Sequence, residues 1–303
     1  RDKKRRKMSK SLGNSPDPIQ LIDEYGADGI RTAMLFASPA GNDLLFDESL
    51  CEQGRNFSNK IWNAFRLVNS WSVERSDSNL IEKSAIQWFE NKLILELNKL
   101  EKSFLDFRIS DSLMILYKLI WDDFCSIYLE MIKPIDKSVS SFTKRKTIDF
   151  FNTLLTCLHP FMPFITEEVW HKINIRNKGD SISFSKWPSV DVDSIDQGLL
   201  SKFDHLFQVV AGIRKIRKEK NIPFKQSLNL FYEKSNSIFL PEVIQKMCNL
   251  ENVELLSDDT SDLFPFLVGV HKYYVPIVFN IDPVSEMKKI NEQIDYLNGF
   301  LNS

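Results

Sequence analysis

Apolar residues recur at every third or fourth position between about residues 48 and 175, which is the period of an α-helix. A helix with one apolar stripe must bury that stripe against another element. Because several such stripes follow one another, we predict an antiparallel helical bundle and a mainly α fold. The clearest stripes are Leu93, Leu97, Leu100 and Phe104, followed by Leu113, Leu116, Ile120, Phe124 and Ile127.

Turn signals divide this region into helices and separate it from a connector that precedes it. Residues 1–47 mix turn residues with short helical stretches, in which Pro18 suits a helix start and Tyr25-Gly26 suits a helix end. Pro163 is placed for the first turn of a helix that has two glutamates near its positive end. Turns between helices are predicted at 76–79, 133–134, 138–141 and 159–160.

The last hundred residues follow a different pattern. A basic amphipathic helix is predicted at about 200–220, with Leu206, Val209, Ile213 and Ile216 on one face. Its cations fall largely on the other face, and they are Arg214, Lys215, Arg217, Lys218 and Lys220. A helix at 241–249 and strand-like runs complete a small α/β module; the runs are 228–232, 253–256, 266–270 and 274–279.

Beyond the module, the chain ends in a heptad pattern, which predicts the start of a coiled coil; its seam is Met287, Ile290, Ile294, Leu297 and Leu301. A length of 303 residues suits two or three domains. We therefore expect a connector at 1–47, a helical bundle at 48–197, an α/β module at 198–282 and the first turns of a coiled-coil arm at 283–303.

Composition narrows the possible functions. The net charge of −2 gives no overall attraction to RNA, so any RNA contact must come from local patches. The apolar runs are far shorter than the roughly 20 residues that a membrane span needs, and we predict a soluble, cytoplasmic protein with no membrane association. The four cysteines are widely separated, so no zinc site and no disulfide framework can be identified, and buried thiols in a reducing cytosol are expected. They are Cys51, Cys125, Cys157 and Cys248.

One short loop carries the clearest chemical signal. Lys7-Met8-Ser9-Lys10-Ser11 is followed directly by Leu12-Gly13-Asn14. Two ammonium groups, two hydroxyls and a flexible Gly13 together suit the binding of a polyphosphate. The basic run at 1–7 could instead be a targeting signal, but it continues into the loop and adds positive charge there.

The pentapeptide resembles the KMSKS signature of class I aminoacyl-tRNA synthetases. Residues 17–18, 25–31 and 37–43 resemble the segment that follows it in the subgroup charging branched aliphatic amino acids, and 54–66 resembles the first bundle helix of the valyl-tRNA synthetase family. Residues 158–170 and Trp187-Pro188 are similar to the end of the anticodon-binding bundle and the motif after it. The resemblance is strong over 7–70, moderate over 157–188 and weak over 203–230.

The resemblance implies roles for these residues. Amino-acid activation from ATP and magnesium places growing negative charge on the departing pyrophosphate, which ammonium groups stabilise. Lys10 is the first candidate for this role and Lys7 the second, while Ser9 and Ser11 orient the loop or donate hydrogen bonds.

The resemblance also implies tRNA contacts. The bundle would read the anticodon of a valine-accepting tRNA through a polar face of its first helix, and a basic helix would contact phosphates. The first set is Arg55, Asn59, Asn63 and Arg66, and the second is Arg214, Arg217 and Lys218. Each set has the alternative of a solvated helix face.

Only six residues precede Lys7, and neither a HIGH-like nucleotide motif nor an editing domain is present. We therefore expect the chain to be the back part of an enzyme, inactive alone and without bound cofactor. Its catalytic and editing domains and amino-acid pocket would lie upstream in the same polypeptide.

Two alternative functions stay open. The first alternative is a leucyl- or isoleucyl-tRNA synthetase. The second is a non-catalytic helical RNA-binding or scaffold protein.

Overall fold

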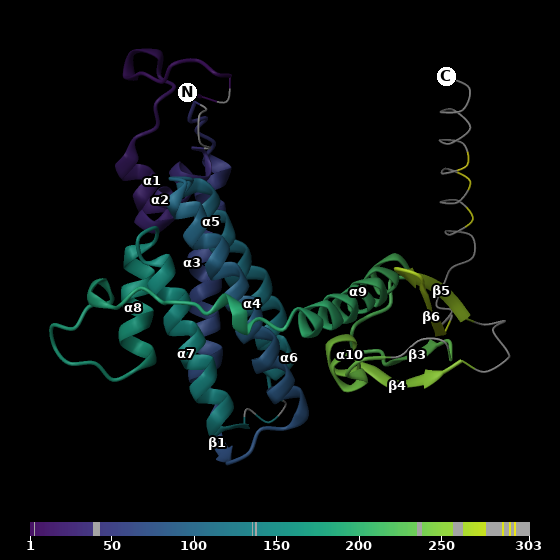
Figure 1. The fold of residues 1–303 in the computed structure, drawn as a ribbon. Coiled ribbons are helices and arrows are strands. Elements are labelled where there is room, and N and C mark those ends of the chain that lie inside the picture. Colours follow the sequence, from purple (N-terminus) through teal and green to yellow (C-terminus); the bar gives the residue numbers. More distant parts are fainter. Residues whose placement is uncertain are drawn as a thin grey trace. The chain divides into compact units, whose positions relative to one another are not determined.

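The chain forms two compact units, Arg1–Leu200 and Ser201–Ser303 (Figure 1). The structure is a computed structural model that describes all residues except 3, 39–42, 135, 137, 235–237, 257–262, 277–286, 288–290, 292–293 and 295–303, and it does not describe the side chain of Lys10. The predicted coiled-coil seam therefore lies outside the described residues, apart from Met287 and Ile294, which are exposed. The prediction of a mainly α fold with a small α/β module is confirmed.

Helices make up most of the first unit. Two short helices, α1 (Pro18–Tyr25) and α2 (Ala27–Phe36), lead into the long helices α3 (Glu48–Asn69) and α4 (Leu80–Leu105). A continuous helical segment follows, made of α5 (Ile109–Lys118), a π-helical stretch η2 (Leu119–Tyr128) and α6 (Leu129–Ile132), and then come α7 (Ser141–Leu158) and α8 (Pro163–Ile173). Short 3-10 turns are η1 (Lys10–Leu12), η3 (Ile182–Phe184) and η4 (Val192–Ser194). Figure 1 shows α3, α4 and α7 running alongside one another, as expected for an antiparallel bundle.

Aromatic packing fills the centre of the bundle. The ring of Phe89 on α4 lies 5.3 Å from Phe124, 5.0 Å from Tyr128 and 5.0 Å from Phe150, measured between ring centroids. All four side chains are buried, and such pairs add to the energy of burying their area. The apolar stripes predicted on α4 and α5 are likewise buried, because those faces turn toward this core; they include Leu93, Leu97, Leu100, Leu113 and Leu116.

The helix boundaries follow the local sequence signals. Pro18 and Pro163 each occupy the first turn of a helix, as predicted, since proline fixes φ and needs no backbone donor there. Asn79 and Glu82 form a capping box at the start of α4, in which each side chain accepts from the other residue's backbone N–H.

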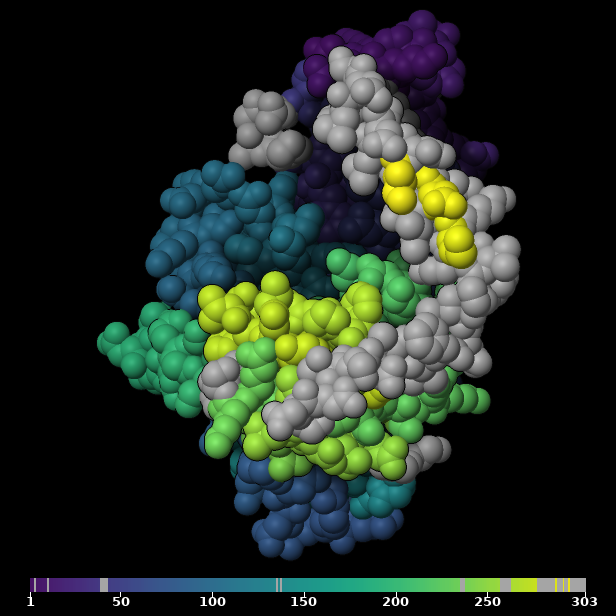
Figure 2. Space-filling view, turned by 90° about the vertical axis from the view of Figure 1, so that its right-hand side faces the viewer, coloured from purple at the N-terminus to yellow at the C-terminus, as the bar shows by residue number. Residues whose placement is uncertain are grey.

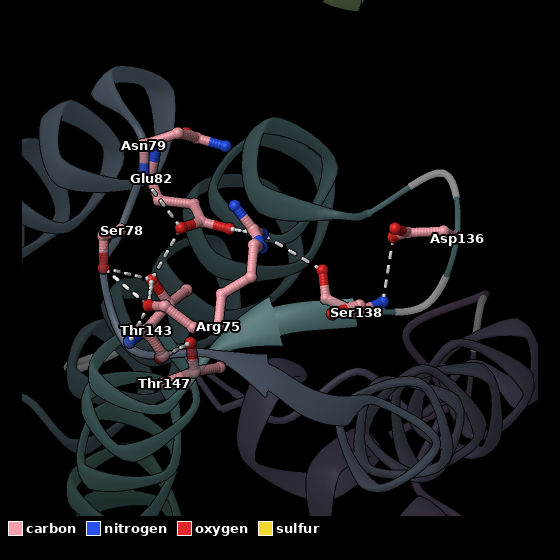
Figure 3. Close-up of polar contacts among 9 residues, drawn as sticks. Arg75, Ser78, Asn79, Glu82, Asp136, Ser138, Thr143 and Thr147 are labelled. Atoms are coloured by element: carbon pink, nitrogen blue, oxygen red, sulfur yellow. Dashed lines mark hydrogen bonds and ion pairs between the residues drawn. The ribbon is translucent and has the colours of Figure 1, made fainter.

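The turn predicted at 138–141 is wrong in part. Residues Ser138–Ser140 form strand β2, which pairs in parallel with β1 (Ser72–Arg75) at the end of the bundle where α3 ends and α7 begins. A buried polar network holds the two segments together (Figure 3). Arg75 donates to Glu82 Oε1 at 2.7 Å and to the carbonyl of Ser138 at 3.1 Å. Three hydroxyls, those of Ser78, Ser140 and Thr143, bond to one another beside it.

The second unit is the α/β module. Most of α9 (Gln197–Glu219) belongs to it, together with α10 (Pro241–Cys248) and a four-stranded sheet of order β4-β3-β6-β5. The strands are β3 (Leu228–Tyr232), β4 (Leu250–Leu255), β5 (Leu263–Val268) and β6 (His271–Pro276). Strand β3 pairs in parallel with β4, whereas β6 pairs antiparallel with both β3 and β5. In Figure 2, β5 and β6 appear in yellow-green on the face toward the viewer.

The expected order of strands and helices in this module is confirmed, with shifted ends. Strands β4, β5 and β6 each begin three residues earlier than the sequence pattern predicts, at Leu250, Leu263 and His271. The cations of the predicted basic helix were expected to lie largely on the face opposite the apolar stripe, and this expectation is wrong for Arg217, which is buried.

Candidate functional site

The loop that carries Lys7 to Ser11 is closed by two polar side chains. Asn14 accepts from the backbone N–H of Ser9 at 3.0 Å and donates to the carbonyl of Lys7 at 3.2 Å. Asn14 also donates to Asp2 Oδ2 at 3.1 Å, and Asp2 accepts from the backbone and the guanidinium of Arg6 at 2.8 Å. These hydrogen bonds, first that from Asn14 and then those from Arg6, hold the pKa of Asp2 well below its usual range.

The loop presents its polar groups at the surface of the first unit. Lys7 and Ser11 are exposed, Ser9 is half-buried, and the hydroxyls of Ser9 and Ser11 lie 3.2 Å apart. The backbone of Lys10 starts the short turn η1, and Gly13 has a φ of +61°, which favours glycine. Figure 2 shows this N-terminal segment in purple at the surface. A hollow of about 390 Å³ beside it is lined by Lys4, Arg6 and Asn14 and also by Asp2 and Glu48, so two cations and an amide share this space with two carboxylates.

The polar face of α3 is partly as predicted from spacing. Asn59, Asn63 and Arg66 are exposed on one side of the helix, while the apolar side buries Phe57 and Ile61. Arg55 differs from them. Its guanidinium lies 5.4 Å from the ring centroid of Tyr25 and 3.7 Å from Glu52, so it packs against α1 and is only half-exposed.

The basic helix α9 contributes fewer free cations than its sequence indicates. The guanidinium of Arg217 donates to four backbone carbonyls, those of Pro223, Gln226, Cys248 and Asn249, at 2.8 to 3.2 Å. It therefore joins α9 to the turn before β3 and to the end of α10, and it is not accessible to RNA. Its spacing of four residues from Ile213 places it on the apolar stripe, which indicates a buried position but does not identify the carbonyls that it binds. Lys218 is exposed, and Arg214 is exposed while donating to the carbonyl of Met247 at 3.2 Å.

Two residues of α2 that the sequence interpretation missed join the connector to the bundle. Asp28 is 6% exposed and accepts from the backbone N–H groups of Ile165 at 2.7 Å and Phe164 at 3.3 Å. Arg31 donates to the carbonyls of Phe161 at 3.1 Å and Pro160 at 3.0 Å. Burial raises the pKa of Asp28 from its usual value. Their partners lie about 130 residues away in sequence, and no local pattern indicates such a pairing.

The remaining candidates for a chemical role are the four cysteines and the possible metal ligands. All four cysteines are buried, as expected, and desolvation raises the pKa of Cys125, Cys157 and Cys248 to about 12. Within the described part of the chain, no group of three or more His, Cys, Asp or Glu residues could hold a metal ion. No helix in that part is both long enough and apolar enough to cross a membrane.

Two protein families match this chain. The family described as tRNA synthetases class I (I, L, M and V) matches residues 1–47, which hold the loop and the connector. The family described as the anticodon-binding domain of tRNA ligase matches residues 87–232. The chain therefore belongs to the class I aminoacyl-tRNA synthetases and carries their anticodon-binding domain.

Within that class, its relatives are valine–tRNA ligases. Those of Christiangramia forsetii and Parabacteroides distasonis are each 45% identical over the whole of this chain, and that of Fusobacterium nucleatum is 35% identical over 97% of it. The chain spans 35% of the length of each of these relatives. A solved leucyl enzyme of Agrobacterium radiobacter, in a ternary complex with tRNA, is similar at a TM-score of 0.45 and 21% identity over 66% of this chain and 24% of that chain.

Proposed function

We propose that this chain is the tRNA-binding part of a valine–tRNA ligase, which joins valine to its tRNA through valyl-adenylate formed from ATP with magnesium. The observation that carries the proposal is the 45% identity to valine–tRNA ligases along the entire chain. Under this proposal the catalytic and editing domains belong to the same polypeptide, and the enzyme works in the cytoplasm.

The loop supplies positive charge to the departing pyrophosphate. Lys10 and Lys7 carry the ammonium groups, which act where negative charge grows during attack on the α-phosphorus. The hydroxyls of Ser9 and Ser11 lie close enough to bind one phosphate oxygen between them. The hydrogen bonds from Asn14 to Asp2 and to the carbonyl of Lys7 fix the distance between the two ends of the loop before the nucleotide binds.

The tRNA contacts divide into two kinds. Asn59, Asn63 and Arg66 lie exposed on α3, where amides bond to base edges and a guanidinium stacks or binds phosphate, which is how unpaired RNA is read. Arg55 joins them at the connector end, with its side chain 40% exposed. Arg214 and Lys218 on α9 contact backbone phosphates, which supply affinity without base specificity. Arg217 is left out of this set because it is buried and both terminal nitrogens of its guanidinium donate to backbone carbonyls inside the module.

Filter binding tests this proposal with the 303-residue chain and three tRNAs, those for valine, leucine and isoleucine, at one fixed salt concentration. We expect the valine tRNA to bind most tightly. Asn63→Ala should reduce that preference about fivefold, the value of one hydrogen bond. Lys218→Ala should weaken all three tRNAs alike, and in a separate salt titration it should lower the slope of log affinity against log salt concentration by about 1. The control is Asn177→Ala, an exposed amide in the loop after α8.

The outcomes separate the candidate functions. A preference for the leucine or isoleucine tRNA would assign the chain to another ligase of the class. Equal affinity for all three would remove the claim of specificity, and loss of the preference in the Asn177→Ala control would remove the assignment to α3.

A further inference from the structure

The start of α8 is capped by a residue from a distant part of the chain. The first backbone N–H groups of any helix lack partners within that helix, and the preceding residue usually supplies one from its side chain. Here that residue is Met162, which makes no such bond, and Pro163 has no N–H to offer. The next two N–H groups, of Phe164 and Ile165, both donate to the carboxylate of Asp28 on α2.

Arg31 completes the same junction from one helical turn further along α2. It binds the carbonyls of Pro160 and Phe161, two of the four residues that connect α7 to α8. The carboxylate therefore occupies the positive end of α8 while the guanidinium takes the negative groups of the turn before it. Four hydrogen bonds with defined directions fix how α2 is rotated against the bundle.

A second contact makes α2 rigid against α3. Gly29 and Gly54 bring the two backbones together, and a Cβ added at Gly54 would lie 2.9 Å from the Cα of Gly29. No side chain separates the helices there, so α2 has no room to slide or turn. The loop Lys7–Ser11 is joined to α2 along the chain by residues 12–17 and α1, and on its other side Arg1 bonds to Leu44 and Phe46 just before α3. Because α2 is held against both α3 and α8, a movement of either helix is transmitted to α2 and from there toward the loop.

We infer that Asp28 and Arg31 are positioning residues that couple engagement of tRNA by the bundle to the placing of the loop Lys7–Ser11 in catalysis. This inference rests on the proposed function, because it needs a loop that acts in adenylate formation or transfer and a bundle that binds tRNA. Neither residue touches substrate; both act by holding α2 at the turn before α8.

The test compares two RNA substrates in the complete ligase to which the chain is proposed to belong. One is the whole valine tRNA, and the other is a minihelix with only its acceptor stem, which cannot reach the bundle. The ratio of kcat/KM for tRNA to that for the minihelix measures the coupling. Asp28→Asn keeps the shape of the side chain but removes its charge and one acceptor. We expect the ratio to fall about tenfold, within the usual range of coupling between sites, mainly through kcat for the whole tRNA.

Two further variants keep the result decisive. Asp23→Asn, an exposed carboxylate on α1, makes the same charge change away from the junction and should leave the ratio unchanged. Arg31→Gln should lower the ratio as Asp28→Asn does, and because Arg31 is largely exposed it serves if Asp28→Asn does not fold.

The possible failures are distinct. An equal loss on both substrates in Asp28→Asn and Arg31→Gln would show that the junction only supports the fold, and the coupling would be refuted. Variants that lose no activity on either substrate would refute it too. A wild-type ligase that does not charge valine would instead overturn the proposed function, whatever the variants do.

Discussion

Removal of the carboxylate of Glu82 should destabilise the first unit more than removal of its ion-pair partner. Glu82 is almost completely buried at the start of α4, where it meets three donors. Oε1 accepts from Arg75 at 2.7 Å, while Oε2 accepts from the backbone N–H of Asn79 at 3.1 Å and from the hydroxyl of Thr143 at 3.2 Å (Figure 3). Its loss therefore affects β1, α4 and α7 at once.

The expected magnitude follows from these three contacts. Loss of the capping interaction with Asn79 costs about 1 kcal/mol. The charge-assisted bond to Arg75 contributes about 1.5 kcal/mol, the low end of its range, because the Arg75 side chain is 40% exposed and partly hydrated. The Thr143 hydroxyl keeps Ser78 and Ser140 as partners, so its loss adds little. We expect Glu82→Ala to lower the free energy of unfolding by about 3 kcal/mol, and Arg75→Ala by about 1.5 to 2 kcal/mol, because Arg75→Ala removes the bond to Glu82 but leaves the Asn79 cap in place.

Urea unfolding followed by tryptophan fluorescence measures this difference cleanly. All six tryptophans lie before residue 200, so their emission reports the first unit and not the α/β module. Glu82→Gln, which keeps the size of the side chain and one acceptor, should fall between the wild type and Glu82→Ala. Equal losses in Arg75→Ala and Glu82→Ala would refute the reasoning, since the ion pair alone would then account for the stability at this end of the bundle.

The remaining predictions concern a buried acid and a close helix contact. Burial raises the pKa of Asp123 to about 6 despite Lys92 at 3.7 Å, so the charged form is disfavoured in the folded state and its cost develops as the pH rises from about 4 to 6. Asp123→Asn should therefore stabilise the first unit at pH 7, by at most about 3 kcal/mol, and leave it unchanged at pH 4 in urea titrations; a larger gain at pH 4 would contradict this. Gly54→Ala should destabilise the first unit by about 3 kcal/mol or more, because its Cβ would strike the backbone of Gly29. In the control Gly198→Ala, the added Cβ meets only a side-chain oxygen at 3.3 Å, so this variant should have little effect. Thermal unfolding measures both.

The elements that could be predicted from sequence are those whose cause is local. Helical periodicity requires only neighbouring residues, so the long helices and the order of strands in the module were predictable. Helix starts at Pro18 and Pro163 depend on the conformation of one residue. The loop at Lys7 to Ser11 was found because its chemistry lies in five consecutive residues.

The features that were missed depend on contacts between distant residues. Strands β1 and β2 have only four and three residues, and β1 is exposed along its length, so neither shows an apolar alternation. Their pairing depends on Arg75 and Glu82 meeting the carbonyl of Ser138 and the hydroxyl of Thr143. The sequence analysis placed Arg217 on the polar face of its helix for a related reason. A cation on an apolar stripe is buried only when carbonyls converge on it, and those carbonyls come from turns that the sequence does not bring together.

The buried carboxylates of Glu82 and Asp28 act at opposite ends of the bundle, and this arrangement separates the stability of the bundle from the orientation of its helices. Glu82 caps α4 where α3 ends, and Asp28 caps α8 beside the start of α3, a helix of 22 residues that is about 33 Å long. Between them the core is held by rings such as Phe89 and Phe124, whose attraction depends weakly on direction. Hydrogen bonds to carboxylates have strict geometry, so they determine how the helices are rotated at each end. Truncation of Phe89 should therefore reduce stability, whereas changes at Asp28 should alter chiefly how the two ends are related, which is the property that coupling across the bundle requires.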